Sequence, residues 1–192
     1  MIGLRVAPME RLEESLLAAI RESLRQGYGV EVELAAGLGE PGFAWDGERG
    51  QYNAPLILHY LLDLAADGPG AGPARLLAVT SKDIYIPMLS FVYGQAQLGG
   101  RVAVVSVARL RPEYYGLPPD EELLQVRARK EALHEVGHLL GLVHCPDASC
   151  AMALSTGIRQ LDRKQPSLCA GCAALASEGR NAARTGRFGE TR

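Results

Sequence analysis

The 192-residue chain lacks a charge excess of either sign and a long apolar run near its first residue. Its 20 basic and 22 acidic side chains give a formal net charge of −2, so we expect no basic surface for DNA, RNA or an anionic membrane. Residues 1–14 hold short apolar stretches interrupted by Arg5, Glu10 and Arg11, which excludes a signal-peptide core or membrane span there. We therefore expect a cytoplasmic protein with no nucleic-acid and no membrane partner.

Histidine and cysteine are scarce over most of the chain. Three of the four histidines lie between residues 134 and 144, and only His59 stands apart. All the cysteines lie in the C-terminal quarter: Cys145, Cys150, Cys169 and Cys172. Without a secretion signal thiols stay reduced, so cysteines at metal-ligand spacing favour zinc, with four free thiols or two disulfides as the alternative. We expect His59 to be an ordinary packed or exposed histidine.

The apolar fraction of 47% is ample for one continuous core, so we expect one domain spanning residues 1–192. Apolar periodicity predicts strands, a hairpin from two of them, and helices that begin after Pro8, at Asn53 and at Asp120. The predicted strands cover residues 2–6, 30–34, 75–80, 91–97 and 102–107. Gly-rich segments at 37–50 and 67–73 read as loops. The expected fold class is α+β, with a mixed twisted sheet and packed helices.

The chemistry is concentrated in residues 134–144, which read His-Glu-Val-Gly-His-Leu-Leu-Gly-Leu-Val-His. His134 and His138 are four residues apart, so they lie on one face of a helix and can bind one ion. Gly141 can adopt the left-handed conformation that ends a helix and turns the chain, which allows His144 to supply a third ligand. Three protein nitrogens leave one tetrahedral position for water, which is typical of a catalytic zinc.

Glu135 cannot face the same direction as His134, its neighbour in sequence. It is better placed to hold the zinc-bound water than to bind the metal. Zinc lowers the pKa of such a water towards about 7, so Glu135 can act as the general base of metal-assisted hydrolysis. The five fixed positions of this pattern would arise by accident in on the order of one chain in 10^5 of this length, so we reject a chance match. A purely structural or vestigial zinc site is the remaining alternative.

The cysteines predict a second metal site of a different kind. Four residues separate Cys145 from Cys150 and two separate Cys169 from Cys172, spacings at the edge of and inside the usual range for zinc ligand pairs. Four thiolates form a closed structural site, which would connect the segment after His144 to a C-terminal helix expected near residues 166–167. Met152 could form an apolar floor beneath the imidazoles, although a methionine alone is more often plain core.

At these residues the chain resembles the archaemetzincins, a branch of the metzincin metallopeptidases, whose signature is the extended histidine motif with a Met-turn. The resemblance covers residues 134–144 and then the cysteines and Met152 in the order that distinguishes this branch. It implies that His134, His138 and His144 bind a catalytic zinc, that Glu135 is the base and that Met152 is the Met-turn residue. It also implies that Cys145, Cys150, Cys169 and Cys172 bind a second zinc.

The resemblance further implies an architecture and a substrate. The family fold places an upper lobe of sheet and helices, here residues 1–141, over a smaller lower lobe, here residues 142–192, which the second zinc would staple. Residues 91–110 resemble the region of the family's edge strand, which pairs with extended substrate. A sheet edge can bind a chain by strand addition. The expected partner is therefore a peptide or protein segment in extended conformation.

Two other classes of function stay open at this point. A zinc-stabilised binding or regulatory protein would keep the metal but hardly turn over substrate. A cysteine-zinc module for nucleic acid is weakened by the acidic charge balance, because it needs a basic face beside its cysteines. The basic tail, residues 179–192, has no periodicity and is expected to be a frayed end.

Overall fold

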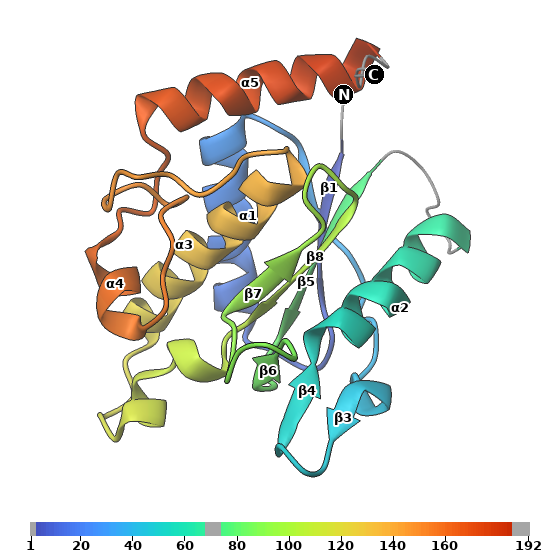
Figure 1. The fold of residues 1–192 in the computed structure, drawn as a ribbon, viewed down its shortest axis with the longest axis vertical. Coiled ribbons are helices and arrows are strands. Elements are labelled where there is room, and N and C mark those ends of the chain that lie inside the picture. Colours follow the sequence, from blue (N-terminus) through green and yellow to red (C-terminus); the bar gives the residue numbers. More distant parts are fainter. Residues whose placement is uncertain (1–2, 68–73, 186–192) are drawn as a thin grey trace.

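The larger of two sheets forms the centre of the molecule (Figure 1). The computed structural model describes residues 3–67 and 74–185. Strand order is β2 (Val32–Leu34), β1 (Leu4–Pro8), β5 (Arg75–Thr80), β8 (Val102–Ser106) and β7 (Gly94–Ala96). The first four strands are parallel, and β7 is antiparallel to β8. All residues of β5 and β8 are buried, as continuous apolar runs in a parallel sheet require.

A smaller sheet lies beside the large one. It consists of β3 (Trp45–Asp46), β4 (Gln51–Asn53) and β6 (Ile84–Tyr85), in the order β3-β4-β6. Three short 3-10 helices, η1 (Gly42–Ala44), η2 (Ala108–Leu110) and η3 (Pro112–Tyr115), complete this part of the chain. Sequence analysis predicted a loop at 37–50, whereas a short helix and a two-residue strand lie within it.

Helices cover both faces of the large sheet. Helices α1 (Glu14–Tyr28) and α3 (Glu121–Leu139) pack together on one face, and α2 (Ala54–Asp67) covers the other (Figure 1). Alternate residues of β5 divide between the two cores: Leu77 faces α1 and α3, whereas Ala78 faces α2. The predicted α+β class with a mixed sheet and packed helices is confirmed.

The helix starts predicted at Asn53 and Asp120 are confirmed by side-chain caps, whereas α1 begins at Glu14, after Pro8 as predicted, without a side-chain cap. The backbone N–H of Leu56 donates to Asn53 Oδ1 at 3.2 Å, and that of Leu123 donates to Asp120 Oδ1 at 2.9 Å. These bonds satisfy amide groups that have no partner inside the helix. The second cap fixes the start of α3, and therefore the rotation of the helix that carries His134 and His138.

Helix α3 ends where the chain must turn towards the third histidine. Gly141 has φ +87°, a conformation that favours glycine, and Leu142 N donates to Gly137 O at 2.9 Å. The buried Arg75 of β5 donates from Nε to Leu139 O at 3.1 Å, which places a cation at the negative end of the helix. The predicted turn at Gly141 is confirmed.

The C-terminal segment differs from expectation in three details. A short helix, α4 (Ile158–Arg163), was not anticipated. Helix α5 (Ala170–Thr185) begins later than the expected residues 166–167, where Ser167 O accepts from Ala151 N at 2.9 Å. Residues 179–185 continue α5, so the expected frayed end is wrong for them, and 186–192 lie outside the described residues.

Within the described part of the chain, no helix combines the length and the apolar character needed to cross a bilayer.

Candidate functional site

The three histidines of the motif converge beside the sheet edge. His134 and His138 lie on α3, and His144 follows the turn at Gly141. One ring nitrogen from each of the three residues lies within 4.8 Å of the others. His134 is buried, and His144 is exposed. The structure therefore brings together the three side chains that the sequence singled out.

Hydrogen bonds fix the tautomers of the two helical histidines. Nδ1 of His134 lies 2.9 Å from Ala151 O, and Nδ1 of His138 lies 2.8 Å from Leu142 O. A carbonyl oxygen only accepts, so each Nδ1 must carry the proton and donate it. In the neutral rings each Nε2 then presents a lone pair. An imidazole that binds a metal through one nitrogen usually donates a hydrogen bond from its other nitrogen, and a backbone carbonyl is one of the common acceptors.

The distance between the two lone pairs supports a metal site. His134 Nε2 lies 3.1 Å from His138 Nε2, and neither nitrogen has a proton to share with the other. Two nitrogens bound tetrahedrally to one zinc lie roughly 3.3 Å apart, given bond lengths of about 2.0–2.1 Å. Facing lone pairs at this separation repel each other unless a cation lies between them. The donor set and spacing therefore fit zinc.

Burial favours the neutral form of all three rings. Burial, followed by the positive charge of Lys164, lowers the pKa of His134 to about 3. Burial is also the main cause of the lowered pKa values of His138 and His144. Neutral imidazole is the form that binds a metal, so the ligands need not lose a proton at neutral pH.

Glu135 is held against the edge strand. Glu135 is only 4% exposed. A Cβ added to Gly94 of β7 would lie 2.5 Å from Glu135 Oε1. Only glycine at position 94 leaves room for this carboxyl. Burial, followed by the charge of Glu131, raises the pKa of Glu135 well above its usual range, and Lys164 opposes the rise. A buried carboxyl beside the histidines is suited to exchanging protons near neutral pH.

The four cysteines form a second cluster. All are free, and their Sγ atoms lie within 4.8 Å of one another. Cys145 Sγ lies 3.8 Å from Cys169 Sγ, close to the ~3.8 Å expected between two thiolates on one tetrahedral zinc. A hydrogen bond from the Cys172 backbone is the main reason that the pKa of Cys169 falls to about 7. The disulfide alternative is contradicted, and the thiol geometry fits a closed zinc site.

One short segment connects the cysteine cluster to the histidines. Cys150 Sγ accepts from Met152 N at 3.4 Å and from Cys169 N at 3.3 Å. The residue between Cys150 and Met152 is Ala151, whose carbonyl accepts from His134 Nδ1. The cysteine cluster and the carbonyl that orients His134 therefore belong to the same short segment of chain.

Met152 packs against the motif helix. It is fully buried, and its side chain occupies the space that a Cβ on Gly137 would need. It lies against the turn of α3 between His134 and His138. The expected role of Met152 as an apolar floor beneath the imidazoles stays a prediction.

A cavity of about 460 Å³ opens over the histidines. Residues 89–96, which include β7, form one wall. The opposite side contains the histidines with Glu131 and Glu135, and Leu154, Ser155, Thr156 and Lys164 of the C-terminal segment. β7 is at the end of the sheet order, so one side of this strand faces the cavity rather than another strand.

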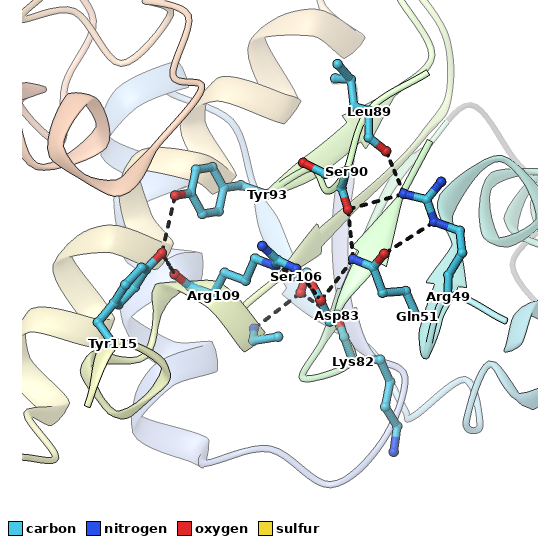
Figure 2. Close-up of polar contacts among 11 residues, drawn as sticks. Arg49, Gln51, Lys82, Asp83, Leu89, Ser90, Tyr93, Ser106, Arg109 and Tyr115 are labelled. Atoms are coloured by element: carbon cyan, nitrogen blue, oxygen red, sulfur yellow. Dashed lines mark hydrogen bonds and ion pairs between the residues drawn. The ribbon is translucent and has the colours of Figure 1, made fainter. Parts of the chain in front are cut away.

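A polar network holds the segment that leads into β7 (Figure 2). Arg49 donates to Leu89 O at 2.9 Å, and Gln51 donates to Ser90 O at 3.0 Å. Gln51 and Arg109 both bind Asp83, Arg109 through two bonds of 2.7 and 2.8 Å. The Arg109 guanidinium also lies 4.2 Å from the centre of the Phe91 ring. The cavity wall is therefore attached to the small sheet and to η2.

Sequence reasoning missed several residues of this site. Glu131 lies four residues before Glu135, and this helical spacing could have placed it on the same face. Lys164, Ser155 and Arg109 carry no motif, and only tertiary structure brings the first two to the cavity and Arg109 to the back of its wall. His59 lies away from the cavity lining, near Asp63 at 4.0 Å on α2.

Comparisons with known proteins agree with this geometry. The family model described as peptidase family M54 matches residues 11–177. The archaemetzincin of Methanocaldococcus jannaschii is 38% identical over 167 residues, 87% of this chain and 88% of the relative. The crystal structure of the Methanopyrus kandleri archaemetzincin superposes with a TM-score of 0.81 at 36% identity, covering 94% of this chain and 96% of that one. A zinc-dependent peptidase from Methanocorpusculum labreanum gives a TM-score of 0.82 at 29% identity, covering 91% and 100%.

Proposed function

The chain belongs to peptidase family M54, and on this premise we propose that it hydrolyses peptide bonds in extended segments with Glu135 as the general base. The family and the relatives make it a zinc metallopeptidase. We propose in addition the roles of individual residues, the kind of substrate and the number of zinc ions.

The observation that carries the proposal is the pair of facing lone pairs on His134 and His138. Both Nδ1 atoms donate to carbonyls, so both Nε2 atoms are acceptors only 3.1 Å apart. We assign these two residues and His144 as ligands of the catalytic zinc. When bound there, zinc acts as a Lewis acid that polarises the scissile carbonyl and acidifies the attacking water.

Glu135 performs the proton transfers in this proposal. Its carboxylate accepts a proton from the attacking water and then delivers it to the amine that leaves. The Glu131 carboxylate and burial favour the protonated form, while Lys164 favours the ionised one. These opposed effects suit a group that must both take and release a proton.

The edge of β7 is the proposed docking strand for substrate. Its backbone groups on the cavity side can pair with an extended peptide, which positions the scissile bond beside Glu135. The polar network around Asp83 keeps the residues before this strand in place. A peptide or protein segment in extended conformation is therefore the proposed partner.

We also propose a second, structural zinc bound by Cys145, Cys150, Cys169 and Cys172. The sulfur spacing and the N–H···S bonds to Cys150 support it. The proposed lobes are residues 1–141 and 142–192. In support, all named strands of the described residues precede Gly141, and both cysteine pairs follow it.

Replacement of Glu135 by Gln tests the base assignment. Gln keeps the size of the side chain but cannot accept the proton, so we expect peptide hydrolysis to fall by roughly 10²–10⁴-fold. Zinc content, measured by atomic emission, should stay unchanged. Glu122→Gln makes the same change at an exposed position in the first turn of α3 and should leave hydrolysis unaltered.

Two outcomes would contradict this proposal. Hydrolysis by Glu135→Gln at the wild-type rate would remove the base role. A wild-type protein that binds zinc and peptides without turnover would instead support the binding or regulatory alternative.

A further inference from the structure

The cavity contains a pair of charged side chains, Lys164 and Glu131, that take no direct part in the proposed proton transfers. Lys164 Nζ lies 3.4 Å from Glu131 Oε1, and the two side chains are only 1% and 4% exposed. Both residues line the cavity beside the histidines. Lys164 comes from the end of α4 and Glu131 from α3, so the pair is formed only in the folded chain.

Stability alone is a poor explanation for this pair. Removing two charges from water costs several kcal/mol per ion, so a buried ion pair is often no better than apolar residues of similar size. Lys130 offers a comparison within the same region. It is also buried, but its ammonium donates to Leu161 O at 3.3 Å and Asp162 O at 3.1 Å, and it does not line the cavity. Lys130 connects α3 to α4, whereas Lys164 faces the site.

Hydrogen-bond donors are in excess at this part of the cavity. An ammonium has three N–H donors, and within the described residues Lys164 Nζ has one hydrogen bond, to Glu131. The Ser155 hydroxyl also lines the cavity, and its Oγ is buried with no partner among the described residues. Two ammonium protons and one hydroxyl proton are therefore left for a bound molecule.

We infer that Lys164 and Ser155 form a subsite for a carboxylate carried by the peptide substrate. This inference rests on the proposed peptidase function and specifies its substrate. A carboxylate offers two acceptor oxygens, and its bonds to an ammonium are about twice as strong as bonds between neutral groups. This carboxylate can belong to an Asp or Glu side chain or to the C-terminus of the peptide.

The other charged groups at the cavity limit where this carboxylate can bind. Glu131 binds the ammonium from one side and its charge would repel a second carboxylate, so the substrate carboxylate must approach the ammonium from the side away from Glu131. Ser155 provides a neutral donor for this approach. Gln95 Oε1 of β7 is buried and also lacks a partner among the described residues, and an acceptor on this strand suits a peptide N–H of paired substrate. A cationic side chain would meet Lys164 directly and is excluded.

Binding of isosteric peptides tests the inference. Short amidated peptides would carry a single Glu, moved through each position, and a matched set would carry Gln instead. Fluorescence anisotropy would measure their binding to zinc-loaded Glu135→Gln protein, in which turnover is suppressed. At one position we expect Glu to bind about tenfold more tightly than Gln, the size of one charge-assisted bond. A third set, with Gln and a free terminal carboxylate, distinguishes the chain end from a side chain.

Variants of Lys164 and Ser155 test whether the preference for Glu over Gln peptides depends on the proposed subsite. Lys164→Met should abolish the preference for Glu, and Ser155→Ala should reduce it. Because Lys164→Met leaves Glu131 buried without a partner, the double variant Glu131→Gln/Lys164→Met removes both charges and should give the same loss. Lys130→Met removes a buried lysine outside the cavity, and it should keep the preference even if the protein is less stable.

The outcomes separate this inference from the proposed function. Equal binding of Glu and Gln peptides at all positions without a gain from a free terminus, tighter binding of Gln, or a preference that survives the double variant would overturn it. Failure of all the peptides to bind would overturn it too. Preference for Glu with no cleavage by the wild-type protein would sustain the carboxylate subsite and contradict the peptidase proposal.

Discussion

At Gly137 the side chains of Met152 and Tyr28 pack closely against the motif helix. A Cβ at this position would lie 2.9 Å from both Met152 Cε and Tyr28 Oη, and it would overlap Met152 Sδ. Neither neighbour can move easily, because Met152 is fully buried and Tyr28 Oη donates to Leu133 O at 2.5 Å. Gly137 is therefore required for close packing of the helix, whereas Gly141 of the same motif is required for the turn that ends it.

Replacement of Gly137 by Ala should destabilise the protein. Alanine normally favours a helix by about 1 kcal/mol relative to glycine, but overpacking a filled core costs about 1–3 kcal/mol or more. We expect the steric effect to be larger, with a net loss of about 1–2 kcal/mol in the free energy of unfolding measured in urea.

Gly171→Ala is the matched control for Gly137→Ala. Gly171 lies in α5, and an added Cβ there meets no atom within 4 Å. This variant should be neutral or more stable by up to about 1 kcal/mol. Equal effects at the two positions would show that packing at Gly137 has no role.

Single residues differ in how far the sequence reveals them. His134 and His138 were predictable because helical spacing places them on one face, and Glu135 was predictable because it follows His134 directly in the motif. Lys164 and Ser155 were not, because their approach to the cavity depends on α4 and on the path of the C-terminal chain. The sequence signals chemistry where residues form a spaced motif, as the histidines and the cysteines do, and gives no signal for isolated residues that only the fold brings to the cavity.

At the scale of elements, β7 depends on contacts from outside its own sheet. Arg109 of η2 binds Asp83 through both arms of its guanidinium and stacks on Phe91 and Tyr114, at 4.2 and 4.9 Å from the ring centres. Tyr115 Oη donates to the Arg109 carbonyl at 2.9 Å (Figure 2). These contacts hold the chain just before the strand proposed to receive substrate.

Replacement of Arg109 by Ala should weaken substrate docking more than chemistry. The wall formed by residues 89–93 would lose its anchor, so we expect KM for a peptide to rise several-fold, about 1 kcal/mol in binding. The value of kcat should change little, because Glu135 and the histidines lie on α3 and the chain after it. Steady-state kinetics with one peptide substrate provides the measurement.

Arg111→Ala is the control for Arg109→Ala. Arg111 pairs with Glu13 at 3.1 Å and does not line the cavity, so KM should stay the same. Arg109→Lys keeps the charge but loses the planar fork, and we expect an intermediate KM. A fall in kcat with unchanged KM would contradict the role in docking.

Elements with strong periodicity were predicted well. The apolar run of β5, the hairpin of β7 and β8, and the caps at Asn53 and Asp120 gave clear local signals that the fold retains. Helix α4 was missed because its six residues carry little amphipathic signal. The start of α5 at Ala170 rather than near residues 166–167 has no signal in the local sequence, and Ser167 O instead accepts from Ala151 N, which lies far from it along the chain.

At the scale of the molecule, the two proposed metal sites share one short segment of chain, from which we infer that they are coupled. Ala151 orients His134 and is joined on one side to Cys150 of the cysteine cluster and on the other to Met152. The chain after Gly141 has few helical residues before α5. Metal binding by the cysteines would therefore supply much of the order in this segment.

Removal of metal should lower the thermal stability of the whole chain. A ligand present at ~1,000 times its Kd stabilises a protein by about 4 kcal/mol, which corresponds to roughly 8–16 °C in Tm at this chain length. We expect a decrease of this size on chelation, measured by calorimetry, and recovery when zinc is restored. Cys150→Ser should reduce the recovery, whereas unchanged Tm values would contradict the coupling.

The central claim is that His134, His138 and His144 bind one zinc and leave one position open beside Glu135. X-ray diffraction from crystals of zinc-loaded protein, recorded on both sides of the zinc absorption edge, tests it most directly. We predict one anomalous peak bound by the three histidine Nε2 atoms and one non-protein ligand near Glu135, and a second peak within the four cysteines. A histidine peak that lacks His144, or that has a fourth protein ligand in the open position, would contradict the account.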